Sequence, residues 1–417
     1  MTDYGVDVLV TVLDEIRHGR AVTRPEIVEH TGIGRGVVAK TVAGLIERGL
    51  VDEEGMAKST GGRAPRMLRL HAEAGHLLAA DIGASSIGAA VTDLGGRVLA
   101  HVEEAADLGD GPEPILGRVQ ALFQQLLDGL ADVPGTLWGV GIGVVGPVEF
   151  ATGRSVAPPF PGWDGYPVRD VFAERYHVPV WVDNDVNVMA LGELRAGIAG
   201  ADDTVVFVKI GTWIGGGLIA GGRVHRGVQG SAGEIGHVRI TDDPAVVCRC
   251  GRVGCVAAIA GGAAMRRDGE RLARAGGSAI LAEVLEQAGR VDASDISAAA
   301  ILGDAASREL IVENGRRIGQ ALAMVVNIYA PSLVVIGGGV ARAGDELLAA
   351  IRESVYARSL PLATRNLVIQ RTVLDERVGV IGAACMAADE IFARHRVAEW
   401  LPHGHPAGHP ELAAGPA

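Results

Sequence analysis

The fold of most of the chain is decided by LLAADIG, residues 77–83, an apolar run that ends in an aspartate and a glycine. Such a run is typical of a buried strand that ends in a turn. A returning strand is expected at 88–93, and similar apolar runs occur at 139–144, 180–183, 204–210 and 333–336. Long helical segments lie between them, most clearly 309–329. The alternation predicts an α/β body, and the doubled strand-and-turn pattern predicts two similar lobes around a cleft.

The first 70 residues follow a different pattern. Apolar residues recur at helical spacing over 6–16, and a second helix is expected at Thr23, which can form a capping box with Glu26. A third helix carries its apolar residues on one side and ends at Gly49. Two strands should follow, joined by the tip STGGRAPR, residues 59–66. This order predicts a winged helix-turn-helix, a DNA-binding module.

Five residues of this module are candidates for contacts with operator DNA. On the outward side of the third helix they are Arg35, Lys40 and Thr41, which suit the major groove. At the wing, glycines permit a close approach of the backbone, and Arg63 and Arg66 can meet phosphates or enter a narrow minor groove. A three-helix protein-interaction domain with a solvated basic face is the alternative, although it gives the arginine-rich tip no packing purpose.

A metal site is predicted where GEIGH, residues 233–237, is followed by CRCGRVGC, residues 248–255. One imidazole and three thiolates around a point form the ligand set of a closed tetrahedral Zn²⁺ site. The ligands are His237, Cys248, Cys250 and Cys255. Four protein ligands leave no position for an activated water, so we expect one structural zinc per chain, which fixes the loop that carries Glu234. A disulfide is the alternative, but three thiols leave an odd one, and Cys385 lies alone in an apolar stretch.

Several motifs together resemble one family. They are DIG at 81–83, DNDVN at 183–187, GT at 211–212 with GGG at 215–217, GEIGH with the cysteine cluster, and Pro331 with IGGGV at 336–340. This set resembles the ROK family, named for repressors, open reading frames and kinases, and the resemblance covers residues 1 to about 390. It implies the actin-like fold of sugar kinases and the Hsp70 ATPase. Members with a winged helix resemble sugar-responsive repressors, and members without it are mostly sugar kinases.

The resemblance also implies a sugar-binding site. Its members are Asn184, Asp185, Glu234 and His237, with the backbone near Gly146 closing one side. These groups offer donors and acceptors that can pair with neighbouring hydroxyls of a hexose, and His237 would present one nitrogen to the metal and its other face to the sugar. Residues 183–185 have an alternative role as turn residues after a strand. A glutamate that usually follows the family's zinc motif is missing, because Ala257 stands in its place.

The phosphate loops depart from those of the family's kinases. The matching positions are Asp81, Gly83 and Ser86 in the first loop, Gly211, Thr212 and Trp213 in the second, and Gly338 on the adenosine side. Ser86 replaces a lysine, and Trp213 replaces a glycine that lets the backbone approach a polyphosphate, so the indole should fill the ATP cleft or displace the loop. Phosphoryl transfer depends on positioning and charge stabilisation, so we expect no enzymatic activity. The alternative is an ATP-dependent sugar kinase with Asp185 as the general base.

Length and composition set the organisation of the chain. Its 417 residues, 48% of them hydrophobic, suffice for two to three domains. The net charge of −12 argues against a protein that coats nucleic acid, but residues 35–69 hold seven Lys and Arg against four Asp and Glu. No apolar run reaches the roughly 20 residues that span a bilayer, and no signal peptide is evident, so we expect a cytoplasmic protein without a membrane partner. The expected units are a winged helix-turn-helix at 1–70, a first lobe at 71–185, a second lobe at 186–395 whose last helix returns to the first, and a disordered tail at 396–417.

These observations predict a transcriptional regulator, most simply a repressor of carbohydrate-metabolism genes, that senses a sugar or sugar derivative. Operator DNA and a carbohydrate effector are the expected partners. The family and the two-fold symmetry of operators imply a homodimer or homotetramer. The ligand would close the lobes and move the DNA-binding modules relative to each other. A DNA-bound scaffold with an empty pocket, regulated by a protein partner, is a further alternative.

Overall fold

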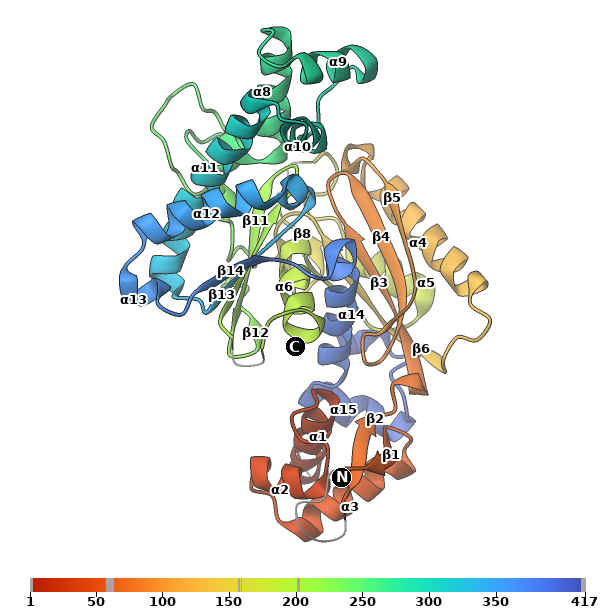
Figure 1. Ribbon diagram of the computed structural model, residues 1–417. Helices are drawn as coiled ribbons and strands as arrows, with labels where there is room; N and C mark the ends of the chain where they lie inside the picture. The colour runs from red at the N-terminus through yellow and green to blue at the C-terminus, as the bar shows by residue number, and fades with distance from the viewer. Residues whose placement is uncertain (1–2, 58–63, 157, 159, 201–202, 414–417) are drawn as a thin grey trace.

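The protein consists of a small N-terminal module and a larger two-lobed body (Figure 1). The computed structural model describes residues 3–57, 64–156, 158, 160–200 and 203–413. The module contains α1 (Asp3–Arg17), α2 (Arg24–Thr31), α3 (Arg35–Glu47), β1 (Val51–Met56) and β2 (Arg66–Leu70). The two strands pair antiparallel, so the order of elements is that of a winged helix-turn-helix, as expected.

Local sequence explains where the second helix of the module begins and ends. The Glu26 N–H donates to the Thr23 hydroxyl at 3.4 Å, and the Glu26 carboxylate accepts from the Val22 N–H at 2.9 Å. This reciprocal arrangement satisfies N–H groups that a helix start leaves free. Gly32 ends α2 with a φ of 67°, a left-handed conformation that costs glycine little. The turn between α2 and α3 is therefore set within a few residues.

Each lobe is built on a five-stranded sheet with the same pairing pattern. The first sheet has the order β5-β4-β3-β6-β9 and the second β12-β11-β10-β13-β14. The first contains β3 (Gly75–Ile82), β4 (Ser86–Asp93), β5 (Val98–Ala105), β6 (Thr136–Val144) and β9 (Val180–Asn184). The second contains β10 (Val205–Ile210), β11 (Ile214–Ala220), β12 (Arg223–Val224), β13 (Leu333–Gly337) and β14 (Val368–Arg371). Read across each sheet in this order, the first two strand pairings are antiparallel and the last two are parallel. The shared pattern confirms the expectation of two similar lobes.

Helices cover the sheets. The first lobe carries α4 (Pro112–Gly129), α5 (Val168–Tyr176) and a small hairpin of β7 (Val148–Glu149) and β8 (Arg154–Ser155). The second carries α7 (Ala257–Ala260), α8 (Gly262–Arg274), α9 (Ala279–Ala288), α10 (Ala293–Ile301), α11 (Ala305–Tyr329), α12 (Asp345–Arg358) and α13 (Pro361–Thr364). No described helix combines the length and apolar character needed to cross a lipid bilayer.

Two further helices, α6 (Asp185–Ala196) and α14 (Val378–Ile391), pack on each other between the sheets (Figure 1). Glycines make this close approach possible. A Cβ on Gly192 would lie 2.5 Å from the Val378 carbonyl oxygen, and one on Gly382 would overlap the Val188 carbonyl. Because α14 also contacts β3 and β6, this late helix of the chain lies against the first sheet. A movement between the lobes must therefore act on α6 and α14.

The C-terminal segment is folded to residue 413, which contradicts the expected disordered tail at 396–417; its last four residues lie outside the described part. Within α15 (Arg394–Trp400), Trp400 is 1% exposed, its ring lies 5.3 Å from that of Trp138, and its N–H donates to the Ile391 carbonyl at 2.9 Å. A buried tryptophan removes roughly 150–250 Å² from water, which stabilises the fold by about 4–6 kcal/mol at about 25 cal/mol per Å². The burial of a few large apolar residues therefore keeps this segment folded in spite of its Pro- and Gly-rich composition.

One hydrophobic core runs from the N-terminal module into the body. Its members include Leu13 and Ile16 of α1, Val42 and Leu45 of α3, Leu68 of β2, Trp138 of β6, Phe392, and Trp400 of α15. In addition, α1 lies directly against α15 (Figure 1). The DNA-binding module is thus packed on the body and is not held by a linker alone.

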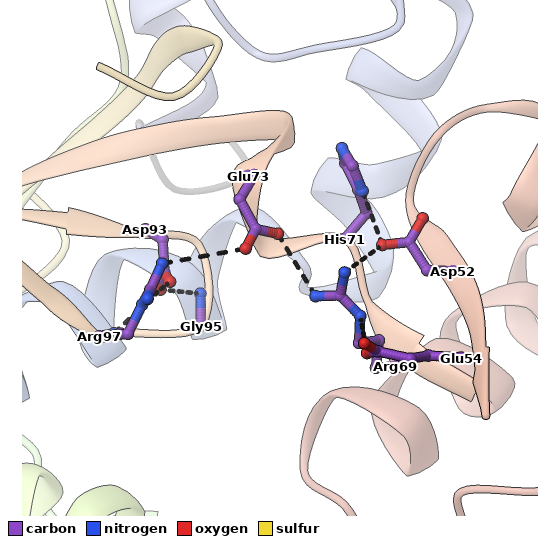
Figure 2. A network of polar contacts seen from close by, with 8 residues as sticks. All are labelled: Asp52, Glu54, Arg69, His71, Glu73, Asp93, Gly95 and Arg97. Atoms are coloured by element: carbon purple, nitrogen blue, oxygen red, sulfur yellow. Dashed lines mark hydrogen bonds and ion pairs between the residues drawn. The ribbon is translucent and has the colours of Figure 1, made fainter. Parts of the chain in front are cut away.

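A polar network also joins the wing to the first lobe (Figure 2). Arg69 of β2 contacts Asp52 at 3.1 Å and Glu54 at 2.7 Å across the wing, and Glu73 at 3.5 Å beyond it. Glu73 lies 3.9 Å from Arg97, in the turn between β4 and β5. These side chains are partly exposed, and such pairs contribute about 0–1 kcal/mol each. The network orients the wing, while the apolar core supplies most of the stability.

Candidate functional site

A cavity of about 1420 Å³ lies between the two lobes. Its volume exceeds the roughly 300–1,000 Å³ of most small-molecule sites. The predicted sugar-site and phosphate-loop residues all line it, namely Gly146, Asn184, Asp185, Glu234 and His237, and Asp81, Gly83, Ser86, Gly211, Thr212, Trp213 and Gly338. The fold therefore brings together residues separated by more than 250 positions in the sequence.

Three polar residues at the start of α6 have three different environments. Asp183 is held by Arg226, whose Nε donates to it at 2.7 Å, so its role is structural. Asn184 caps α6 by accepting from the Val186 N–H at 3.0 Å. Asp185 is the first residue of α6 and is 2% exposed, at the helix end whose dipole favours a negative charge. The alternative role of these residues, as turn residues after a strand, therefore fits Asp183 and the capping bond of Asn184. Asp185 instead lines the cavity.

A lysine that sequence reasoning missed binds Asp185. The ammonium of Lys209, in β10, donates to Asp185 Oδ2 at 2.6 Å. It also lies at the first phosphate loop, where a Cβ on Gly83 would be 3.7 Å from Nζ. Burial lowers the pKa of Lys209, but Asp185 and Asp81 outweigh it and raise the pKa above its ordinary value. Burial raises the pKa of Asp81 to about 7 against the effect of Lys209.

The four predicted metal ligands lie together. One ligand atom from each of His237, Cys248, Cys250 and Cys255 falls within 4.8 Å of the others. The Cys250 and Cys255 sulfurs are 3.7 Å apart, and the Cys248 sulfur is 3.7 Å from His237 Nδ1. Tetrahedral Zn²⁺ with Zn–S bonds of about 2.3 Å implies sulfurs about 3.8 Å apart. The donor set and its spacing fit a metal ion without rearrangement.

The metal cluster adjoins the predicted sugar residues through His237. Its Nδ1 faces the sulfurs, while its Nε2 lies 3.7 Å from Glu234 Oε2. Burial raises the pKa of Glu234, and the nearby Asp185 raises it further. Ala257, which stands in place of the family's glutamate, also lines the cavity. The metal loop therefore sets the position of Glu234 and His237, and Ala257 leaves space beside them.

The second phosphate loop is a tight turn with little backbone free for a phosphate. The Gly211 N–H donates to the Trp213 carbonyl at 2.9 Å, and the Gly211 carbonyl accepts from the Gly262 N–H at the start of α8 at 2.8 Å. A Cβ on Gly338 would lie 2.6 Å from the Ile210 carbonyl oxygen, so this glycine serves strand packing. Helix N-termini bind phosphate through free N–H groups, and here one of them is used by the loop itself.

Trp213 lines the cavity, and its loop is closed. Its ring centroid lies 5.0 Å from that of Phe160 in the first lobe, and the Arg249 guanidinium lies 5.2 Å above it. Because a tight turn can hold a large side chain at its edge, the indole reaches across the cleft toward the metal loop. Trp213 thus bridges the two lobes.

The candidate DNA-contacting residues lie on the N-terminal module. Arg35 and Lys40 are exposed on α3, and neither forms an ion pair with a described residue. Thr41 is half-buried on the same helix. Arg66 is exposed at the base of the wing, with Nε 3.6 Å from Glu53. Arg63 lies outside the described residues.

A second, partly buried ionic cluster, also missed from the sequence, joins the module to the body. Asp389 of α14 accepts from Arg17 of α1 at 2.7 Å and from Arg195, in the last turn of α6, at 2.9 Å. His18 Nε2 lies 3.6 Å away. Burial alone would raise the pKa of Asp389, but these cations outweigh it and hold the pKa well below its usual range. One helix, α6, therefore begins at the cavity with Asp185 and is linked at its last turn, through Asp389, to the N-terminal module.

Comparison with known proteins agrees with this geometry. Residues 77–390 match the ROK family. A putative xylose repressor of Caldicellulosiruptor sp. is 30% identical over 390 residues, which cover 93% of this chain and 95% of the relative. A ROK family transcriptional regulator, a homologue of the E. coli MLC protein, has the same fold over 99% of this chain and all of its own, with a TM-score of 0.80 at 23% identity. A ROK family glucokinase from Streptomyces griseus, solved with glucose and AMPPNP, covers 75% of this chain and 99% of its own length at 30% identity, with a TM-score of 0.64. The chain belongs to the ROK family.

Proposed function

We propose that this protein is a transcriptional repressor that binds operator DNA through its winged helix-turn-helix and a carbohydrate effector in the cleft between its lobes, without phosphorylating it. The similarity to a xylose repressor over nearly the whole length of both chains supports this proposal. Operators are commonly two-fold symmetric, so we propose that a homodimer or homotetramer binds them. One Zn²⁺ per chain, held by His237 and the three clustered cysteines, would fix the metal loop.

The observation that carries the proposal is the position of α6. Its first residue, Asp185, lies in the cavity, and Arg195 in its last turn binds Asp389, which binds Arg17 of the module. A helix of twelve residues is short and stiff, so a displacement at its first turn moves its last turn as well. A ligand that closes the lobes thereby changes the position of α1, and α1 packs on α3. The effector and DNA sites would be coupled through this helix.

Several features oppose a kinase function. Both oxygens of Asp185 already accept hydrogen bonds, Oδ2 from the Lys209 ammonium at 2.6 Å and Oδ1 from the Val186 N–H at 2.9 Å. The second loop uses its backbone groups internally, and Ser86 supplies no charge for a phosphate. The match to a glucokinase covers 74% of this chain, whereas the match to the repressor covers 93% of it.

The test is DNA binding by the full-length protein to a labelled fragment from upstream of its own gene, followed by fluorescence anisotropy. We expect binding that weakens with salt, and a change of at least fivefold on addition of D-xylose, D-glucose or N-acetylglucosamine. A doubled Arg35→Ala and Lys40→Ala variant should lose binding while its sugar affinity is retained. The absence of DNA binding at low salt would overturn the proposal.

A parallel assay addresses catalysis. The protein is incubated with ATP, Mg²⁺ and the same sugars, and ADP release is compared with that of an Asp185→Ala variant. We expect equal, background rates. Sugar-dependent release that disappears in Asp185→Ala would establish the kinase alternative.

A further inference from the structure

Lys209 stands out because lysine is rare in this chain. The sequence contains three lysines, Lys40, Lys58 and Lys209, among 38 basic residues. The first two belong to the DNA-binding module, where flexible point charges suit phosphates. Lys209 is therefore the one lysine of the body, and it lies at the floor of the cleft. Elsewhere in the body the positive charges are carried by arginine.

The ammonium of Lys209 lies where three parts of the protein meet. It donates to Asp185 at the start of α6, lies beside Gly83 of the first phosphate loop, and is attracted by Asp81 at the end of β3. Its side chain is 20% exposed, and that of Asp185 is 3% exposed. A compact ammonium with three rotatable donors can bond to one carboxylate and still attract a second one nearby. Lysine is therefore the basic residue type that suits this position.

Acidic groups outnumber this cation. Asp81, Asp185, Glu103 and Glu234 line the same part of the cavity as Lys209. Asp81 Oδ1 is buried and has no hydrogen-bond partner among the described residues. Neighbouring carboxylates of this kind can attract a divalent ion, which commonly binds nucleotide phosphates at one or two carboxylates. In this protein the Lys209 ammonium is bonded to Asp185 and attracted by Asp81.

We propose that Lys209 is a built-in cation of the cleft, which takes the place of a divalent ion at Asp185, beside Asp81, and so leaves Asp185 available only as a hydrogen-bond acceptor. Mg²⁺-nucleotide is excluded because the ammonium cannot share this position with a second cation. The substitution of Ser86 for the family's lysine is then one part of the change, and Lys209, contributed by the opposite lobe, is the other.

This arrangement also defines the class of effector, an inference that rests on the proposed function. The acids that interact with Lys209 or Asp185 are Asp81, Glu103 and Glu234, so carboxyl groups outnumber the one ammonium beside the predicted sugar residues, while Arg249, Arg266, Arg267 and Arg371 also line the cavity. A phosphorylated or acidic sugar would be repelled, whereas a neutral sugar can donate its hydroxyls to the carboxylates. The structure therefore favours a neutral carbohydrate over a sugar phosphate.

The first experiment measures Mn²⁺ binding by electron paramagnetic resonance on full-length, zinc-loaded protein. We expect Lys209→Met to bind Mn²⁺ at least tenfold more tightly than the wild type, because it leaves Asp81 and Asp185 without their cation. Lys209→Arg retains the charge and should resemble the wild type. Adding Asp185→Asn to Lys209→Met should abolish the new site. Equal Mn²⁺ affinity in the wild type and Lys209→Met would overturn the proposal.

A second experiment needs no variant and decides the matter if Lys209→Met fails to fold. Wild-type protein is reductively methylated with ¹³C-formaldehyde, and its lysines are mapped by mass spectrometry. Lys209 should react at least tenfold more slowly than Lys40, because its ammonium is buried and paired. Equal rates would show that Lys209 does not occupy the site.

The ligand class is tested by calorimetry with paired neutral and phosphorylated sugars, D-glucose with glucose 6-phosphate and N-acetylglucosamine with its 6-phosphate. For any pair that binds, the neutral sugar should bind at least tenfold more tightly, and the reverse order would refute the assignment of ligand class. If no sugar bound, the proposed effector function would fail, while the Mn²⁺ and methylation results would still decide the role of Lys209.

Discussion

Each end of α6 takes part in an ion pair with another part of the chain, but the balance of charge at the two ends is opposite. At the cleft end, Asp185 of α6 is bound by one ammonium, that of Lys209, which Asp81 also attracts. At the junction end, Asp389 is bound by two guanidinium groups and lies beside a histidine. At the cleft end, Asp81 Oδ1 has no hydrogen-bond partner among the described residues. At the junction end, both carboxylate oxygens of Asp389 accept hydrogen bonds.

This difference teaches how one helix can serve both recognition and transmission. A cluster with unsatisfied acceptors can take hydroxyl groups from a ligand, because pairing them lowers the cost of their burial. A satisfied cluster holds one geometry, because breaking it leaves an uncompensated buried charge. Recognition is expected at Asp185 and mechanical connection at Asp389.

The largest effect is expected from breaking the junction. Asp389→Ala leaves Arg17 and Arg195 without their acid, and we expect a loss of about 3 kcal/mol in the free energy of unfolding, measured by urea denaturation. Asp7→Ala is a matched control, since it breaks an exposed pair with Arg394 between the same regions and should cost less than about 1 kcal/mol. Equal losses in the two variants would contradict a special role for Asp389.

The same pair of proteins gives a pH dependence. The pKa of Asp389 is lower when folded than when unfolded, so its contribution is present above the unfolded pKa of about 3.8 and is lost as pH falls. The difference in unfolding free energy between wild type and Asp389→Ala should be constant from about pH 5 to 8 and shrink below about pH 4. A difference that grows on acidification would contradict this assignment.

The next largest effect is expected from breaking the cleft end through its metal loop. Cys255→Ser should reduce the metal content from about one Zn²⁺ per chain to none, as measured by elemental analysis. Sugar affinity should fall by about 10–100-fold, because His237 and Glu234 lose their support. Sugar-free DNA binding should be retained, since the junction is untouched. Cys385→Ala, outside the cluster, should keep its metal; metal loss there as well would point to general unfolding.

A smaller effect would sharpen the description of the cleft. Trp213→Ala and Phe160→Ala, singly and together, form a double-mutant cycle on unfolding free energy. We expect a coupling energy of about 0.5–1.5 kcal/mol for the two rings. Trp213→Gly should not bind an ATP analogue, because Lys209 remains in place. Additive losses in the cycle, or nucleotide binding by Trp213→Gly, would contradict the bridging role.

The smallest effect is expected for DNA binding itself, in a variant that leaves both ends of α6 intact. Lys40→Ala should reduce the slope of log affinity for DNA against log salt by about one, without changing sugar affinity. Arg274→Ala, on α8 far from the module, is the control and should leave the slope unchanged. A larger effect of Arg274→Ala would place the DNA-binding face elsewhere.

Much of the fold and part of the site could be predicted from sequence because the relevant signals are local. The cysteines lie within eight positions of one another, and Thr23 and Glu26 are three positions apart. Apolar runs likewise predicted β3, β4, β6, β9, β10 and β13, but not β5, β11, β12 and β14. The prediction of a disordered C-terminal segment was wrong. It was based on the Pro- and Gly-rich composition, which does not reveal that Trp400 and Leu412 are buried.

The sequence by itself determined which residue types were available: a zinc ligand set, a helix cap, strand ends rich in polar groups, and a phosphate loop without its lysine. Only the tertiary structure decided which charges meet. Lys209 is 24 positions from Asp185, and Arg17 is 372 positions from Asp389. Ion pairs of this kind carry no periodicity or fixed spacing, since their partners come together only after the sheets and α6 have packed. For that reason the cation of the cleft and the junction to the DNA-binding module could be found only in the folded protein.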